Sequence, residues 1–247
     1  MLNYQFSDKF IQRLKQCCNI AVLTGDSVSA ESGMPAFHGK DGVWKNHNTA
    51  DLASLETLEK DPKLFWDFFR SRRETLAGLK PNLGHYALVD MENLYPDFSL
   101  STQNVDGLHT AAGSKKVNEL HGSINSSRCS VCGLRAEEAD KTVFTEIPKC
   151  PKCSELLRPD VVLFGEPLPS KILADAQEAA AVCEIYFSIG TSSFGEPAST
   201  LPYVAKGNGA YIIEVNMERT PLSDQADEVM IGPASEILPA LVMRLMK

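Results

Sequence analysis

Residues 20–29 read Ile-Ala-Val-Leu-Thr-Gly-Asp-Ser-Val-Ser. An unbroken apolar run from Ile20 to Leu23 leads into Thr24-Gly25, where the sequence turns polar. A short apolar run bounded by turn-forming residues is typical of a strand buried on both faces of a sheet. We therefore expect a buried strand here, followed at its carboxyl end by a loop that starts near Gly25.

Similar apolar runs follow along the chain and alternate with helical patterns. The further predicted strands are Phe98 to Thr102, Val117 to Leu120, Val161 to Phe164, Ile185 to Ile189, Tyr211 to Val215 and Val229 to Ile231. The first predicted helix has Phe6, Phe10, Leu14 and Cys17 on one face, and the second begins at Asp61-Pro62. The further predicted helices are Pro81 to about Tyr95, Ser170 to Val182, Pro197 to Lys206 and a last one from about Ala234. This alternation predicts an α/β fold, a Rossmann-like doubly wound parallel sheet covered on both faces.

Four of the seven cysteines form two pairs, Cys129-x-x-Cys132 and Cys150-x-x-Cys153, with 17 residues between the pairs. This spacing is typical of a structural zinc site, in which each pair supplies two thiolates to a tetrahedron. Two chance pairs of free thiols are the alternative, and a redox role fits poorly because it usually needs one exposed pair at a helix start. Four ligands close the coordination sphere, so we expect one structural zinc ion and no catalytic role for the metal.

The composition is ordinary for a globular protein of 247 residues, with 43% hydrophobic and 23% charged side chains. The formal net charge of -8 argues against nucleic acid as the main partner, because phosphate binding needs clustered Lys and Arg. The N-terminal segment has no apolar signal core, and no apolar run approaches the ~20 residues that span a bilayer. We expect a soluble cytoplasmic protein with no membrane partner and no sequence-specific nucleic-acid partner.

Polar segments follow several of the predicted strands directly. They read Thr24-Gly25-Asp26-Ser27-Val28-Ser29, Thr102-Gln103-Asn104-Val105-Asp106, Leu120-His121-Gly122, Gly190-Thr191-Ser192 and Val215-Asn216-Met217-Glu218. In open parallel sheets, ligands bind beyond the carboxyl ends of the strands. These segments are therefore the candidate site.

Taken in this order around the cysteine pairs, the segments resemble those of one family, the sirtuins, in its bacterial and archaeal form. The other motifs that carry the resemblance are Ala30-Glu31-Ser32-Gly33, Phe37, Gly42-x-Trp44, Arg158-Pro159 and Phe164-Gly165-Glu166. The match covers nearly the whole chain. It implies a Rossmann-like NAD-binding domain made of residues 1–39, 81–122 and 159–247, and a small domain that combines a helical insert, 40–80, with a zinc-binding module, 123–158. The acyl-lysine would enter the cleft between them.

The resemblance also implies tasks for individual residues. His121 would be the general base on a ribose hydroxyl, which suits an imidazole because it exchanges protons near neutral pH. Asn104 would be the second catalytic residue, and with Asp106 it would hold the nicotinamide ribose and carboxamide. The implied NAD-binding residues are Gly25, Asp26, Ser27, Ser29, Glu31, Phe37, His38, Trp44, Gln103, Asp106, Gly190, Thr191, Ser192, Asn216, Glu218 and Ala234, of which the last three would meet the adenosine end. The implied substrate-binding residues are Ala53, Phe69, Arg72, Val162, Phe164, Gly165 and Glu166, and the segment around Phe164 would pair with the peptide as an added strand.

The cofactor loop departs from the family pattern. Gly25-Asp26-Ser27 stands where the family usually has Gly-Ala-Gly, and Phe37-His38-Gly39 stands where it has Phe-Arg-Gly. Asp26 adds a negative charge to a loop that should approach a pyrophosphate, and Ser27 adds bulk. One interpretation is weakened or altered NAD chemistry, and the other is tolerated drift in which these side chains point away.

A second departure concerns the acyl group. Sirtuins that favour succinyl or malonyl groups carry an Ala and a Tyr-x-x-Arg near the acyl pocket, and Ala53 and Phe69-x-x-Arg72 occupy those places here. Arg72 could pair with a distal carboxylate, but Phe69 lacks the phenol hydroxyl. The alternative is that Phe69 packs in the core and Arg72 is solvated.

The resemblance predicts an enzyme that removes acyl groups from protein lysine, acetyl first and succinyl or malonyl as open choices. NAD would be the co-substrate, acylated lysine in proteins or peptides the partner, and nicotinamide and O-acyl-ADP-ribose the products. Two other functions stay open: an NAD-consuming ADP-ribosyltransferase or NAD hydrolase, and a non-catalytic binding module. His121 favours deacylation, because hand-over of the acyl group needs a base more than loss of nicotinamide does. The sequence does not give the oligomeric state.

Overall fold

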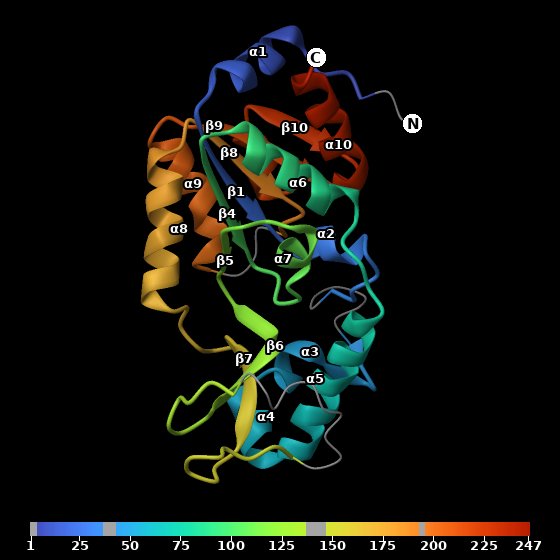
Figure 1. The fold of residues 1–247 in the computed structure, drawn as a ribbon, viewed down its shortest axis with the longest axis vertical. Coiled ribbons are helices and arrows are strands. Elements are labelled where there is room, and N and C mark those ends of the chain that lie inside the picture. The colour runs from blue at the N-terminus through green and yellow to red at the C-terminus, as the bar shows by residue number, and fades with distance from the viewer. Residues whose placement is uncertain (1–3, 37–42, 137–146, 193–195) are drawn as a thin grey trace.

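The computed structural model describes residues 4–36, 43–136, 147–192 and 196–247 (Figure 1). Six parallel strands form the central sheet, in the order β10-β9-β8-β1-β4-β5. They are β1 (Asn19–Thr24), β4 (Asp97–Thr102), β5 (Val117–Glu119), β8 (Ile185–Ile189), β9 (Tyr211–Asn216) and β10 (Glu228–Ile231). The chain continues from β1 to β4 and β5 on one side and later builds β8 to β10 on the other, so the strand order reverses beside β1. Open α/β sheets bind their ligands at such a point.

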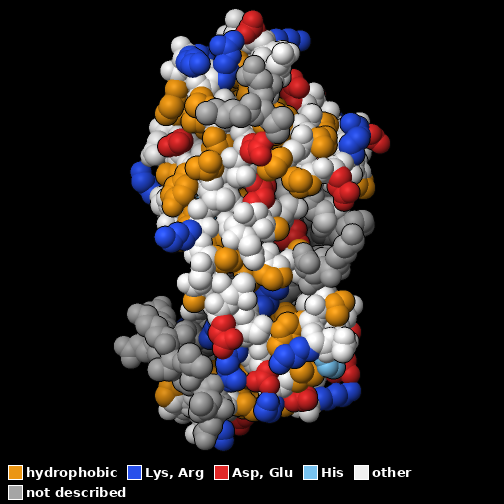
Figure 2. Space-filling view, turned by 90° about the vertical axis from the view of Figure 1, so that its right-hand side faces the viewer, with side chains coloured by type: hydrophobic (Ala, Val, Ile, Leu, Met, Phe, Trp, Pro, Cys, Tyr) orange, Lys and Arg blue, Asp and Glu red, His pale blue; other side chains and the backbone are white. Residues whose placement is uncertain are grey.

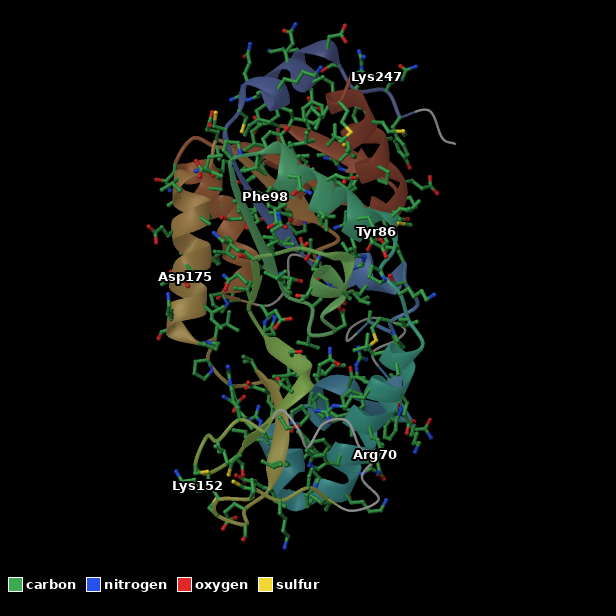
Figure 3. All side chains as sticks on the ribbon, in the orientation of Figure 1. Arg70, Tyr86, Phe98, Lys152, Asp175 and Lys247 are labelled. Atoms are coloured by element: carbon green, nitrogen blue, oxygen red, sulfur yellow. The ribbon has the colours of Figure 1, made fainter. Side chains whose placement is uncertain are left out.

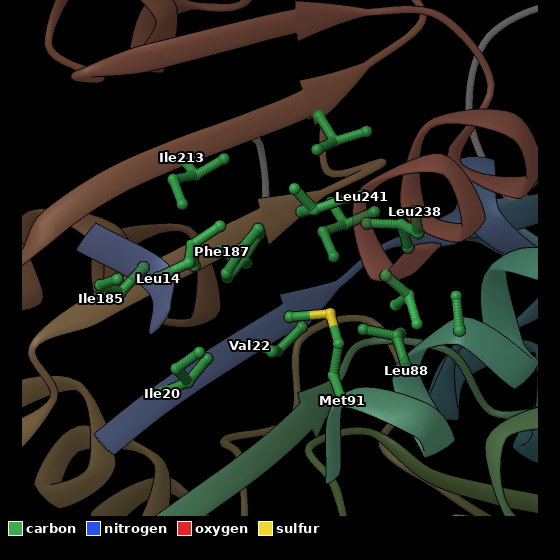
Figure 4. Packing of buried hydrophobic residues seen from close by; sticks show 14 of the residues in the cluster. Leu14, Ile20, Val22, Leu88, Met91, Ile185, Phe187, Ile213, Leu238 and Leu241 are labelled. Atoms are coloured by element: carbon green, nitrogen blue, oxygen red, sulfur yellow. The ribbon is translucent and has the colours of Figure 1, made fainter. Parts of the chain in front are cut away.

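Helices cover both faces of this sheet. Neighbouring side chains of a strand point to opposite faces, so an unbroken apolar strand has apolar side chains to bury on each face. In β1, Ile20 and Val22 join the core beneath α1 (Asp8–Gln16), α6 (Leu83–Leu94) and α10 (Ala234–Leu245), part of which Figure 4 shows. Ala21 and Leu23 join the core beneath α8 (Ser170–Val182) and α9 (Leu201–Gly207). This two-sided burial explains the unbroken apolar runs and confirms the predicted fold class.

A third core holds the smaller part of the molecule together. Its elements are β2 (Val43–Trp44), β3 (His47–Asn48), α3 (Thr49–Leu52), α4 (Leu55–Lys60), α5 (Pro62–Ala77), β6 (Gly122–Cys129) and β7 (Leu157–Val161). Strands β6 and β7 form an antiparallel pair beside α5. In Figure 2 the molecule is elongated and narrows between this part and the sheet. The helical insert and the zinc module thus share one core, while the exact bounds of the two domains stay a prediction.

Helix α5 begins where the sequence predicts. Asp61 caps it by accepting a hydrogen bond from the Leu64 backbone N–H at 3.0 Å, and Pro62 occupies its first position. A carboxylate cap followed by proline is a favoured helix start, since proline has no N–H to leave unpaired there. The aromatic residues of this helix are buried, which explains the dense aromatic run.

The predicted strand from Val161 to Phe164 is wrong as a member of the parallel sheet. Val161 ends β7, whose partner is the antiparallel strand β6. Phe164 belongs to none of the named strands and forms an isolated parallel bridge to Ser54, with a hydrogen bond from its N–H to the Ala53 carbonyl at 3.0 Å. An apolar run marks burial but does not tell which strand it pairs with, so the sequence could not place this segment.

The remaining elements are short. They are α2 (Asp26–Ala30), α7 (Leu108–Ala112) and two 3-10 helices, η3 (Ala198–Thr200) and η4 (Pro221–Asp224). The helix predicted from Pro197 to Lys206 is therefore divided into η3 and α9. Among the described residues, none of the helices combines the length and the apolar character that crossing a bilayer requires.

Candidate active site and metal centre

The loops after β1 and β8 touch at the carboxyl edge of the sheet. A Cβ atom on Gly25 would lie 2.4 Å from the Gly190 carbonyl oxygen and 2.8 Å from the Thr191 Cα. Gly190 has a φ of +61°, a conformation that side chains other than glycine rarely adopt. The Ser27 N–H donates to the Gly190 carbonyl at 3.2 Å. Gly25 and Gly190 are therefore needed to bring the two loops together.

A cavity of about 570 Å³ opens beside these loops, between the sheet edge and the small part. Its lining residues are Gly25, Asp26, Ser29, Met34, Pro35, Ala53, Phe69, Arg72, Gln103, Asn104, Val105, Asp106, His121, Val161, Val162, Leu163, Phe164, Gly165, Glu166, Pro167, Leu168, Ser192, Glu196 and Pro197. The segments that follow β1, β4, β5 and β8 all contribute. The structure thus brings together motifs that are far apart in the sequence.

A hydrogen-bond network orders the polar floor of the cavity. The Ser29 hydroxyl donates to Asp106 Oδ2 at 2.6 Å, and the Leu108 backbone N–H donates to Asp106 Oδ1 at 2.9 Å. Asn104 Nδ2 donates to both the Gly25 carbonyl and the Ser29 hydroxyl at 2.9 Å. Both hydrogens of the Asn104 amide are therefore used, and its oxygen is the atom that can accept a bond from a ligand.

His121 presents one ring nitrogen to the cavity. Its Nδ1 lies 3.0 Å from the Gln103 carbonyl oxygen. A carbonyl only accepts hydrogen bonds, so Nδ1 carries the hydrogen, and Nε2 of the neutral ring is a free base. Burial lowers the pKa of His121, and the bond to Gln103 opposes this only partly. The side chain is thus neutral and able to take a proton near pH 7.

Arg72 lies in the wall of the same cavity and is almost fully buried, with 6% of its surface exposed. One guanidinium nitrogen, Nη2, donates to the Pro35 carbonyl at 2.8 Å. Burial lowers the pKa of Arg72 to about 10, while the negative charges of Asp106 and Asp26 act in the opposite direction. Arg72 is therefore a buried cation near two carboxylates of its own chain, which excludes the alternative of a solvated charge.

Phe69 forms an apolar part of the wall. It is fully buried and packs against Phe65 and Phe68, with ring centroids 4.8 and 5.1 Å away. Ala53, 4% exposed, lies in the same lining. Phe69 has no hydroxyl, so at this position the wall beside Arg72 gives a polar acyl group no hydrogen-bond partner.

The segment from Val162 to Glu166 is held from behind by a buried ion pair. Arg158, 3% exposed, donates to both carboxylate oxygens of Glu166 at 2.6 and 2.8 Å. Burial opposes ionisation of Glu166, but the bonds from Arg158 and from the Leu163 N–H outweigh it and lower the pKa. A bidentate arginine–carboxylate pair of this kind fixes geometry as well as charge.

The four paired cysteines converge at the far end of the small part, where Figure 3 labels Lys152. All four sulfur atoms lie within 4.8 Å of one another, and Cys129 Sγ lies 3.4 Å from Cys153 Sγ. Sulfurs bound to one zinc at ~2.3 Å in a tetrahedron would be about 3.8 Å apart, close to this arrangement. A hydrogen bond from the Cys132 backbone N–H lowers the pKa of Cys129 to about 6, which favours the thiolate that binds metal. The donor set therefore fits Zn²⁺ in a closed, structural site.

Several residues implied by the resemblance have other tasks here. Glu31 does not line the cavity; its two carboxylate oxygens accept from the Ala234 and Ser235 N–H groups at 2.8 Å and cap α10. Trp44 donates from Nε1 to the Ser71 hydroxyl at 2.9 Å and packs edge-on against Phe68. Both side chains thus have contacts within the protein, and their contact with a cofactor stays a prediction.

The adenosine-side residues lie outside the lining of this cavity: Asn216 ends β9, Glu218 follows that strand, and Ala234 begins α10. Asn216 donates from Nδ2 to the Thr191 carbonyl at 2.7 Å, and the Thr191 hydroxyl lies 2.9 Å from that of Ser188. Glu218 is exposed and Ala234 is buried. Their contacts with a cofactor stay a prediction, and Phe37 and His38 lie outside the described residues.

The sequence analysis missed some lining residues. They are Met34, Pro35, Val105, Val161, Leu163, Pro167, Leu168, Glu196 and Pro197. Most of them lie next to a predicted residue, so extending each motif by a few positions would have found them. Glu196 and Pro197 follow the Gly190-Thr191-Ser192 turn and carry no signal of their own.

Fold and site together define a class: a Rossmann-like α/β protein with a four-cysteine metal module and a polar cavity at the carboxyl edge of its sheet. The model of the Sir2 family matches residues 25–197. The chain is 48% identical over 209 residues to an NAD-dependent protein deacylase of Aquifex aeolicus, which covers 85% of this chain and 87% of the relative. It is 43% identical over 225 residues to one of Pyrococcus furiosus, covering 89% and 90%.

Solved structures agree with these relatives. A Sir2 homologue in complex with NAD superposes with a TM-score of 0.92 at 36% identity, covering 99% of this chain and 95% of that one. A Sir2 protein with a p53 peptide and NAD superposes with a TM-score of 0.85 at 29% identity, covering 97% and 98%. The chain belongs to the Sir2 family, the sirtuins.

Proposed function

We propose that the protein is an NAD-dependent protein-lysine deacylase. The observation that carries this function is the free Nε2 of a neutral His121 in the same cavity as the Asn104–Ser29–Asp106 network. When bound, NAD would supply the ribose carbon that takes the acyl oxygen as nicotinamide leaves, and with one water molecule from the solvent the products are nicotinamide, O-acyl-ADP-ribose and free lysine. The curated relatives named above carry the same activity in their names.

His121 takes up the proton in this scheme. Its Nε2 accepts the proton of a ribose hydroxyl, which makes that oxygen a better nucleophile. The charge that develops on the ring is stabilised by the Gln103 carbonyl, which accepts from Nδ1–H. The lowered pKa of His121 keeps the ring ready to accept at pH 7.

The Asn104 network positions the nicotinamide side of NAD. Because the Asn104 amide nitrogen is fully used, its oxygen is the atom that would accept a hydrogen bond from a ribose hydroxyl of NAD. Ser29 is fixed between Asn104 and Asp106, so the three side chains act as one rigid unit. Rigid polar groups of this kind orient a substrate at little cost when it binds.

The acylated peptide pairs with the segment from Val162 to Glu166. On this segment the N–H groups of Val162, Phe164 and Glu166 already donate to other backbone carbonyls, at 2.8–3.0 Å. The Leu163 carbonyl is also used, because it accepts from the Glu166 N–H, so an added strand would pair with other backbone groups of the segment such as the Gly165 N–H and the Val162 carbonyl. Phe164, 41% exposed, offers an apolar surface beside the entrance.

The test is an incubation with NAD and acetyl-lysine peptide in which every product is identified by mass. Equal amounts of nicotinamide, O-acetyl-ADP-ribose and free lysine support deacylation. Free ADP-ribose without peptide turnover would indicate an NAD hydrolase, and a peptide heavier by one ADP-ribose would indicate a transferase. No NAD consumption would favour the non-catalytic module. A cytoplasmic location stays a prediction.

A further inference from the structure

Three buried polar side chains lie directly behind the Asn104 network. Thr24 ends β1 and Thr102 ends β4, and the two threonines are paired in register across the parallel strands. His109 belongs to α7, the short helix that follows Asp106. All three side chains are 2% exposed or less, and none of them is part of the described cavity lining. They are therefore not placed to touch a ligand in the cavity, and any effect on it must pass through other residues.

The Thr24 hydroxyl joins the other two side chains by hydrogen bonds. It donates to Thr102 Oγ1 at 2.8 Å, so its oxygen accepts from His109 Nε2, also at 2.8 Å. Thr102 Oγ1 accepts a second bond, from the backbone N–H of Asn104 at 3.0 Å. A continuous chain of bonds thus runs from α7 across the ends of β1 and β4 to the backbone of Asn104.

This chain of bonds closes the segment 103–107, which contains Asn104 and Asp106. The N–H of the first residue of the segment donates to the Thr24 carbonyl at 2.9 Å. At the end of the segment, Asp106 Oδ1 accepts from the first backbone N–H of α7 at 2.9 Å, and His109 lies in that helix. The bond from His109 to Thr24 therefore ties the end of the segment back to its start. Side chains on a segment that is fixed at both ends keep their orientation before a ligand binds.

The position of Thr24 requires a hydroxyl group and not only a side chain of this size. Its side chain is fully buried and is both a donor and an acceptor. Valine has nearly the same shape but no hydroxyl, so it would leave the His109 N–H without its acceptor. A buried donor without a partner is costly, and α7 would have to move to find another acceptor. The end of the segment 103–107 would move with it.

We propose that Thr24 and His109 are positioning residues for NAD, which hold Asn104 and Asp106 in the orientation that receives the nicotinamide ribose. The proposal rests on the proposed function, in which the Asn104 oxygen accepts from a ribose hydroxyl. Neither Thr24 nor His109 is a catalytic residue, because neither lines the cavity. Their bond prepares the NAD-binding side of the site in the free protein, so its loss should weaken NAD binding more than peptide binding.

The first test compares Thr24→Val with Thr24→Ser by calorimetric titration of NAD. We expect the Kd for NAD to rise about tenfold in Thr24→Val, which removes the hydroxyl, and by less than about threefold in Thr24→Ser, which keeps it. Val22→Ala is the control, since the Val22 side chain is buried in the same strand and belongs to the apolar core. It should lower the melting temperature but leave the Kd within about twofold, which separates positioning from a loss of stability. An unchanged Kd in Thr24→Val, or equal rises in Thr24→Val and Thr24→Ser, would overturn the proposal.

The second test removes both ends of the bond. His109→Phe keeps a ring but has no N–H, and it should weaken NAD binding by a factor similar to that of Thr24→Val. In the double variant the loss should be similar to that in either single variant, because the two changes remove the same bond. The double variant also provides the measurement if Thr24→Val alone fails to fold, since it leaves no unpaired donor at this place. Losses that multiply in the double variant would overturn the proposal, because the two residues would then act separately.

Steady-state kinetics separate this inference from the proposed function. In Thr24→Val the KM for NAD should rise, while the KM for acetyl-lysine peptide should stay within about twofold, because other contacts hold the segment around Phe164. If the unaltered protein binds NAD but removes no acyl group, the proposed function is wrong, and the titrations still decide the task of Thr24 and His109. If it deacylates and Thr24→Val binds NAD normally, the function stands and the inference is wrong.

Discussion

His121 combines a fixed tautomer with a lowered pKa, and both bear on the pH dependence of catalysis. The base must be neutral to accept a proton, and burial keeps it neutral to lower pH than a solvated histidine. We expect kcat/KM to rise with pH through an apparent pKa below 6.5 and then to stay level through pH 8. Initial rates between pH 4.5 and 8.5 on acetyl-lysine peptide check this, and an acid limb centred above 6.5 would contradict the assignment.

The same residue allows a direct test of its task. His121→Ala should lower kcat by ~100-fold or more, the usual effect of losing a general base. Zinc content, melting temperature and NAD affinity should stay close to those of the unaltered protein, because the ring makes one hydrogen bond, to Gln103. Peptide deacylation at an undiminished rate would transfer the role of base to another residue.

Gly25 is the residue on which the contact between the two cofactor loops depends. Gly25→Ala would place a Cβ 2.4 Å from the Gly190 carbonyl, so one loop must move. We expect the free energy of unfolding to fall by about 1–3 kcal/mol, as for other overpacked sites, and NAD affinity to fall with it. Gly207→Ala is the matched control, since nothing lies within 4 Å of its added Cβ and its φ is not positive. Denaturant melts and NAD titrations should separate the two variants; equal melts would show that the loops adapt.

At the scale of elements, the zinc module also supports the acyl wall. Helix α5 carries Phe69 and Arg72 of this wall, and hydrogen bonds from Arg73 and Trp66 tie it to the β6–β7 pair. Arg73 donates to the Ile124 carbonyl of β6 at 2.6 Å, and Trp66 donates to the Leu157 carbonyl of β7 at 3.0 Å. The cysteines hold the far ends of these strands, so the metal should stabilise the wall of the cavity from a distance.

Loss of the metal should therefore affect substrate binding as well as stability. Cys150→Ser, or treatment with a strong chelator, should release one zinc per chain, lower the melting temperature and aggregate the small part, because structural zinc often contributes ~10 kcal/mol or more of binding free energy. Cys18→Ser is the control, since Cys18 is exposed and lies outside the cluster. Metal analysis and calorimetric melts check this; unchanged melting of metal-free protein would refute a structural zinc.

The elements also show how far the sequence could be interpreted. Strand β8 and helix α8 have the predicted bounds, because long periodic or apolar runs between turn residues allow few alternatives. The Val161–Phe164 segment was wrongly assigned to the parallel sheet, because its apolar residues Val161 and Leu163 are buried in the core of the small part instead. The contacts that Glu31 and Trp44 make within the protein could not be predicted for a related reason: a motif fixes a residue in the chain, but the partner of its side chain comes from α10 or α5. The cavity itself depends on such contacts.

At the scale of the whole molecule, two histidines that are buried in the described part of the chain make its stability depend on pH. His85 and His109 lie beneath the site with ring centroids 4.7 Å apart, and both are almost inaccessible to solvent. The Thr24 hydroxyl donates to Thr102, so it accepts from His109 Nε2 at 2.8 Å, and His109 is neutral with a bare Nδ1. Burial lowers the pKa of His85 to about 4 and that of His109 to about 3.

These lowered pKa values predict the direction of acid unfolding. Below the ordinary histidine pKa of about 6.5 the unfolded chain binds protons that the folded protein refuses, down to about pH 4 for His85 and pH 3 for His109. Stability that is fully present above pH 6.5 is thus lost as the pH falls, by about 1.4 kcal/mol per pH unit for each histidine. His109→Gln should be less stable at pH 7, where it loses the bond to Thr24, but its stability should fall less steeply between pH 6.5 and 4.5. The exposed His47→Gln is the control and should leave the slope unchanged. Urea melts at half-unit pH steps measure both slopes, and an unaltered slope in His109→Gln would show that this ring takes up a proton in the folded protein.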